Sequence, residues 1–257
     1  MSDRSAHRDR GGPDLQAFRA AVGDDLETLA LLHDREPDAA TLGALSEIGF
    51  PLNLGLRLDQ GRAGEVASAM ARVVASLPAE PDAALLDELA ADYAQIYLTH
   101  AIRAAPMESV WIDKEGLVRQ GPMFAVRDHY RRHGLEVRDW SMRPDDHLVT
   151  ELQFLAHLMT RVDGEAALAE AAHFLDEHPL RWVGQFATRV AQRCASEYFA
   201  GLALTTSAYL EQLREVLAEL TGIARPAAEE IAQRALRAED IEELELPTSG
   251  PLTGPTW

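Results

Sequence analysis

Apolar residues recur at three- and four-residue steps along most of the chain, which is the spacing of one face of an α-helix. In the first half, this pattern predicts helices over 14–33, 62–76 and 82–98, and a further helix restarts after Pro37. Asp82 precedes the third of these blocks and is a suitable N-terminal cap. The first half is therefore expected to be a series of amphipathic helices.

The same periodicity continues in the second half of the chain. Four blocks carry it: 122–133, which is terminated by Gly134, and 145–161, 164–177 and 179–221. The last block is too long for one globular helix, and Ser196 is a plausible break and cap within it.

Two interruptions organise the chain. Between 101 and 122 the periodicity lapses, and "DKEG" predicts a tight turn between two short extended pieces. Long loops inside compact domains are often functional. A second gap, 138–144, is the best candidate for a hinge. The expected organisation is a disordered lead-in at 1–13, helical portions at 14–137 and 145–222 on either side of this hinge, and an acidic amphipathic segment with a mobile tail at 223–257.

Composition supports an all-α fold of about ten helices. The chain has 47% hydrophobic but only 6% aromatic residues, with 17 Gly and 13 Pro among 257 residues. These proportions favour Ala- and Leu-rich helices over a sandwich or barrel.

The charge and the single cysteine limit the classes of partner and compartment. A net charge of -18 repels nucleic acid and anionic membranes but attracts a basic peptide. Cys194 has no partner for a disulfide, which fits a reducing compartment such as the cytoplasm. No apolar run reaches transmembrane length and the N-terminus is no signal peptide, so we expect no stable membrane insertion.

The stretch "RPDDHLVTEL" combines two carboxylates and an imidazole at the start of a predicted helix. A helix start explains the proline and one aspartate, but not the second acid or His147. His147 and Glu151, with Asp145 and Asp146, resemble part of a metal site. Because no further ligands fall in a recognisable motif with them, we expect no metal there and no hydrolase activity.

Other chemical candidates are weaker. His129 and His133 have a metal-ligand spacing, but they lie in a last helical turn beside two arginines, where imidazoles interact with the helix dipole and a metal ion is repelled. Cys194 shares a helical face with apolar residues and is expected to be a core residue rather than a thiolate nucleophile. No Gly-rich phosphate-binding motif occurs, so no cofactor is expected.

Four stretches of the chain occur in a recognisable order and spacing. They are "APMESVWIDKEGLVRQGP", "VRDHYRRHGLE", "RPDDHLVTELQFLAHLM", and "FLDEHPLRWVGQFATRV" followed by "YFAGLAL". Together they resemble the TorD/DmsD family of cytoplasmic molybdoenzyme maturation chaperones. The resemblance implies an all-helical, non-catalytic protein, a monomer or dimer. It would bind the apo catalytic subunit of a molybdopterin-dependent oxidoreductase, often through its twin-arginine signal peptide, and hold it until the cofactor is inserted.

Carried over residue by residue, the resemblance places the family's loop motif on Pro106, Glu108, Ser109, Val110 and Trp111, and its hinge motif on Pro144, Asp146 and His147, with Asp145 between. From their position at the junction of two helical portions, we expect Asp146 to be available to the client and Asp145 to serve mainly the helix terminus. We expect His147 to be held by Glu151 and to donate to a peptide carbonyl. The expected site residues are Pro106, Glu108, Ser109 and Trp111 in the loop, and Trp140, Pro144, Asp145, Asp146, His147 and Glu151 around the hinge.

The sequence departs from the family pattern in two places. Met107 and Trp111 replace the family's usual aromatic residues, and "GDDLET" introduces charge into the first helix. A helical scaffold that binds mature redox subunits, or a metal-dependent hydrolase centred on Asp146 and His147, are the alternative functions.

Overall fold

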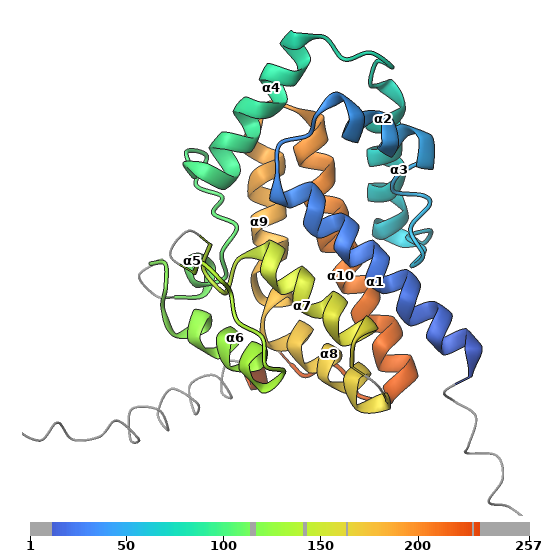
Figure 1. Cartoon of the computed structure of the whole chain (residues 1–257), viewed down its shortest axis with the longest axis vertical. Coiled ribbons are helices and arrows are strands. Elements are labelled where there is room, and N and C mark those ends of the chain that lie inside the picture. The colour runs from blue at the N-terminus through green and yellow to red at the C-terminus, as the bar shows by residue number, and fades with distance from the viewer. Residues whose placement is uncertain (1–11, 114–116, 141–142, 163, 228, 232–257) are drawn as a thin grey trace, which may run out of the picture. The chain divides into compact units, whose positions relative to one another are not determined.

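The computed structural model describes residues 12–113, 117–140, 143–162, 164–227 and 229–231. Helices make up all the regular elements in these ranges (Figure 1). They are α1 (Pro13–Asp34), α2 (Ala39–Ile48), α3 (Gly61–Ser76), α4 (Ala83–Tyr93), the π-helix η1 (Ala94–Leu98), α5 (Ser109–Ile112), α6 (Gly121–Arg132), α7 (Leu148–Thr160), α8 (Glu165–Glu177), α9 (Pro179–Arg193) and α10 (Glu197–Thr221). The all-α prediction is confirmed.

Side-chain caps fix where several helices begin. Asp82 accepts a hydrogen bond from the Leu85 amide at 2.9 Å, as its position before α4 predicts. Ser196 is the N-cap of α10 and separates it from α9, which confirms the predicted break in the long apolar run. The caps satisfy backbone donors that have no partner within the first helical turn.

Helices from both halves of the sequence share one core. The most extensive pairings join α1 to α7, and join α10 to both α9 and α3 (Figure 1). The described residues up to Ala224 accordingly form one compact unit with a shared core. Within the described ranges, no helix combines the length and apolar character needed to cross a bilayer.

Buried carboxylates tie loops to this core. Asp25, in the charged "GDDLET" stretch of α1, accepts from the amides of Gly55 and Leu56 and from the Tyr209 hydroxyl, each at 2.9 Å. Asp92 in α4 accepts from the Ala195 and Ser196 amides between α9 and α10. The charge in α1 therefore serves packing, since it satisfies donors that would otherwise be buried without a partner.

The structure corrects three sequence-based predictions. The piece before "DKEG" is the helical turn α5 and not an extended segment. The helix predicted over 145–161 begins only at Leu148, so the two aspartates precede it. The helix predicted over 82–98 changes to η1 after Tyr93. Residues 1–11 of the expected lead-in, and the tail from 232, lie outside the described residues.

Candidate functional site

The loop and hinge segments singled out in the sequence lie directly against each other. Met107 and His147 form an isolated antiparallel bridge. On either side of it, the Glu108 amide donates to the Asp146 carbonyl and the Leu148 amide donates to the Pro106 carbonyl, both at 2.9 Å. The loop after η1 and the start of α7 are therefore one hydrogen-bonded unit.

Asp146 holds the beginning of α5. Its carboxylate accepts from the Ser109 amide at 2.8 Å and also from the Ser109 hydroxyl. Both side chains are fully buried. Burial raises the pKa of Asp146, and the nearby Glu108 raises it further, while the two bonds from Ser109 oppose these effects. In this conformation, Asp146 positions the loop and does not face solvent.

Asp145 contacts α6, not the end of α7. Its carboxylate forms an ion pair with Arg127 at 2.8 Å, and the Tyr130 hydroxyl donates to its carbonyl at 3.0 Å. The prediction that Asp145 serves the helix terminus is therefore wrong. The physical reason is that its side chain points across the hinge to a residue on another helix, which sequence spacing along α7 does not reveal.

His147 is the N-cap of α7. Its Nδ1 accepts from the Val149 amide at 3.1 Å. Burial, helped by Arg143, His33 and His100, lowers the pKa of His147 to about 3, so the ring is neutral near pH 7. This removes the expected titration of His147 in the physiological range for the unbound protein.

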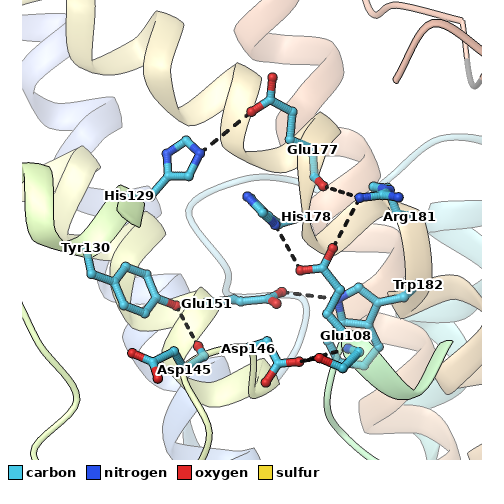
Figure 2. Close-up of polar contacts among 11 residues, drawn as sticks. Glu108, His129, Tyr130, Asp145, Asp146, Glu151, Glu177, His178, Arg181 and Trp182 are labelled. Carbon is cyan, nitrogen blue, oxygen red and sulfur yellow. Dashed lines mark hydrogen bonds and ion pairs between the residues drawn. The ribbon is translucent and has the colours of Figure 1, made fainter. Parts of the chain in front are cut away.

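Glu151 does not hold His147, contrary to the expectation. Its carboxyl group accepts from the Trp182 indole at 3.2 Å, deep between α7 and α9 (Figure 2). Burial raises the pKa of Glu151 well above its usual range, and Glu108 and Asp146 add to this effect. Burial and the two neighbouring carboxyl groups therefore both act against the charged form of Glu151.

Glu108, Asp146 and Glu151 form a buried cluster of three carboxyl groups. The Glu108 carboxylate is hydrogen-bonded to the His178 Nδ1 at 2.9 Å, and Arg181 approaches it at 3.6 Å (Figure 2). One oxygen each of Glu108, Asp146 and Glu151 is buried without a hydrogen-bond partner among the described residues. Unpaired buried acceptors are costly, so a change that rearranges the loop would also rearrange this cluster.

The two tryptophans of the expected site have different environments. Trp111 is anchored, since its indole donates to the Ala105 carbonyl at 2.8 Å and Arg189 lies over its ring. Trp140 is 47% exposed. The guanidinium groups of Arg119 and Arg127 lie over its ring, 5.4 and 5.3 Å from the centroid.

A cavity of about 510 Å³ opens beside the joined segments. Of the ten expected site residues, only Pro144 and His147 line it. The sequence analysis missed the other lining residues, which include Tyr93, Tyr97, Leu98, His100 and Arg138. Tyr93 and Tyr97 recur at helical spacing and resemble core positions, so the sequence carried no signal that they face a cavity.

Comparison with known proteins identifies the family of the chain. Residues 59–188, half of the chain, match the family described as nitrate reductase delta subunit. The chain belongs to this family. The region that matches the nitrate reductase delta subunit family includes Trp111 in the loop and Trp140 in the hinge. The joined segments therefore lie inside it.

Curated relatives connect the family to chaperones. The chain is 33% identical over 141 residues to "Chaperone protein TorD" of Vibrio cholerae, covering 52% of this chain and 64% of the relative. It is 32% identical over 113 residues to the protein of the same name from Vibrio vulnificus, covering 41% and 53%. The match thus spans less than two thirds of these relatives. The resemblance to the TorD/DmsD family is confirmed.

Proposed function

We propose that this protein is a non-catalytic chaperone that binds the apo catalytic subunit of a molybdopterin-dependent oxidoreductase in the cytoplasm. The observation that carries the proposal is the joining of the loop 106–111 to the hinge segment 144–148 beside an open cavity. The relatives named as TorD chaperones support the same role.

The lining of the cavity suits an extended peptide with apolar and basic side chains. Tyr93 and Leu98 supply apolar surface, and Leu98 is 64% exposed. Arg143 lines the cavity and is paired with Asp34, and both side chains are partly exposed. An arginine of the client can replace Arg143 on Asp34, because the two guanidinium groups make the same charge-assisted bonds. A twin-arginine signal peptide has this chemistry.

Within this proposal the expected site residues act in two ways. His147 and Pro144 contact the client directly, because they line the cavity. Asp146, Ser109 and Glu108 act indirectly, by holding the loop against the hinge, because they are fully buried. Asp145 and Trp140 lie on the α6 side of the hinge and are joined through Arg127.

Co-purification of the chaperone with a client tests the proposal. The protein is co-expressed in its native host with a molybdoenzyme catalytic subunit, with and without the signal peptide. Leu98→Glu places a charge in the apolar part of the cavity and is expected to lower the yield of complex at least tenfold, or about 1.4 kcal/mol of binding free energy. The matched control is Leu52→Glu, because Leu52 is 61% exposed and does not line this cavity.

Two results would contradict the proposal. Equal loss of complex in both leucine variants would mean that the cavity has no special part in binding. Equal binding of the apo and the cofactor-loaded enzyme would favour the scaffold function over maturation. If only the subunit with its signal peptide binds, that peptide is the main epitope.

A further inference from the structure

A cluster of potential metal ligands lies outside the cavity, where α6 meets the junction of α8 and α9. His129, Glu177 and His178 each contribute one donor atom, and these atoms lie within 4.8 Å of one another. No other group of three or more such residues occurs in the described part of the chain. The Nε2 atom of His129 and the Oε2 atom of Glu177 are 3.7 Å apart.

The hydrogen bonds of the two imidazoles leave one nitrogen of each available. Arg132 contacts the Nδ1 of His129 at 2.6 Å, so its Nε2 remains on the side of Glu177. Glu108 contacts the Nδ1 of His178 at 2.9 Å. Figure 2 shows the second ring nitrogen of His178 turned away from Glu108, toward the side on which His129 lies.

We propose that His129, Glu177 and His178 form a binding site for a divalent transition metal, for which Zn²⁺ is the best probe. Two imidazoles and one carboxylate are a common three-ligand set for zinc, with water completing the tetrahedron. Glu177 is 35% exposed and His129 13%, so the fourth position can open to solvent.

The hydrogen bond between Glu108 and the proposed ligand His178 supports the metal site. A carboxylate that accepts from the second nitrogen of a ligating histidine fixes the ring and makes it a better donor. Glu108 is fully buried and stands in this relation to His178. The arrangement of carboxylate, histidine and metal position is the one that zinc sites in proteins use.

The charges around the cluster act in opposite directions. Arg132 and Arg181 approach His129 and Glu108 and oppose a cation. Glu177, Glu108 and the net charge of -18 favour one.

The site differs from the one considered in the sequence. There, His129 was paired with His133 on the same helix, and a metal was not expected. In the structure His133 pairs with Glu170 instead, at 3.0 Å. The partners of His129 come from the end of α8, so a bound metal would join α6 to the α8–α9 junction.

Metal binding to the full chain without a polyhistidine tag tests the proposal. After dialysis against a chelator, equilibrium dialysis at pH 7.5 with Zn²⁺ is expected to give one bound equivalent, and the melting temperature should rise. Co²⁺ should give the visible absorption of a tetrahedral site. Mg²⁺ should not compete, because it prefers oxygen ligands. Failure of Zn²⁺ to bind, or full competition by Mg²⁺, would overturn the proposal.

Substitutions of the proposed ligands test which residues bind the metal. His129→Gln and Glu177→Gln are expected to abolish the Co²⁺ absorption, and Glu108→Gln to weaken binding about 10- to 100-fold. His133→Gln is the matched control on the same helix and should bind normally. Circular dichroism of each apo variant separates loss of metal from loss of fold. Normal Co²⁺ absorption in a folded His129→Gln protein would place the metal elsewhere and refute the assignment.

Discussion

At the scale of single residues, two adjacent aspartates perform different tasks. Asp145 faces α6 and pairs with Arg127, whereas Asp146 faces the loop and accepts two bonds from Ser109. Consecutive residues in a non-helical segment point in different directions, so neighbours in sequence can serve different elements. Replacing the one or the other therefore tests different contacts.

Asp146→Ala is expected to lower the free energy of unfolding by about 1–3 kcal/mol, because it leaves the buried Ser109 amide without an acceptor. Asp146→Asn should cost less, since its amide oxygen can still accept from Ser109. Urea denaturation followed by circular dichroism measures both. An Asp146→Ala protein as stable as the wild type would show that this contact does not hold the loop.

Buried histidines determine part of the pH dependence. His33 lies between the Tyr97 and Thr206 hydroxyls, at 2.6 and 2.8 Å, and burial lowers its pKa to about 3. The unfolded chain takes up a proton on this ring near pH 6.5, whereas the folded chain does not until about pH 3. The stability contribution is therefore present above pH 6.5 and is lost as the pH falls toward 3.

His33→Gln is expected to flatten this pH dependence. Below pH 6.5, each such histidine steepens the loss of stability by about 1.4 kcal/mol per pH unit, and His147 should retain its share in the variant. Urea unfolding at pH 7 and pH 5 provides the slopes. His173→Gln, at an exposed position, is the control. Equal slopes in the wild type and His33→Gln would contradict the burial of a neutral His33.

At the scale of elements, the close approach of α1 to α7 depends on a glycine. A Cβ atom placed on Gly23 would lie 2.2 Å from the Cγ2 atom of Thr160. Thr160 is held in turn by a bond from its hydroxyl to the Ala156 carbonyl at 2.8 Å. Because α1 and α7 come from opposite halves of the sequence, this crossing contributes to joining both halves into one core.

Gly23→Ala is expected to destabilise the protein by about 1–3 kcal/mol, since the added methyl group overpacks the crossing. Gly43→Ala in α2 is the matched control, because nothing lies within 4 Å of its Cβ position. It should instead stabilise by about 0.5–1 kcal/mol through helix propensity. Thermal and urea denaturation compare the two. If both variants gained stability, the crossing would not need a glycine.

At the scale of the whole molecule, the net charge bears on how the proposed client would approach the protein. The net charge of -18 attracts basic peptides over a distance that salt controls. The screening length falls from about 30 Å at 0.01 M salt to about 10 Å at 0.1 M. Steering of a basic client should therefore weaken over this range of ionic strength, while short apolar contacts in the cavity persist.

A peptide with consecutive arginines and an apolar segment is expected to associate much faster at 0.01 M than at 0.1 M salt. Stopped-flow tryptophan fluorescence gives the rates, and Trp140→Phe shows whether the exposed indole reports binding. A lysine-substituted peptide should bind more weakly, because it cannot form bidentate bonds with a carboxylate. Equal rates at both salt concentrations, or equal affinity of the lysine peptide, would contradict guanidinium recognition.

The sequence by itself determined the order of the long helices, but not the short helix α5 or the start of α7. The apolar spacing and the caps Asp82 and Ser196 act within a few residues of each other, so they can be read along the chain. The all-α class follows from this periodicity, and the choice of the loop and the hinge as candidate segments follows from their resemblance to one family. The direction of each side chain does not follow, because it depends on which helices pack together.

Only the tertiary structure decided the contacts of the candidate site. Ser109 and Asp146 are 37 residues apart in sequence, and their bond exists because the loop packs against the start of α7. The same packing buries Glu151 beside Trp182 and gives His129 partners from α8 in place of His133. Periodicity records which face of a helix is buried, but contacts between distant segments are set by how those faces meet.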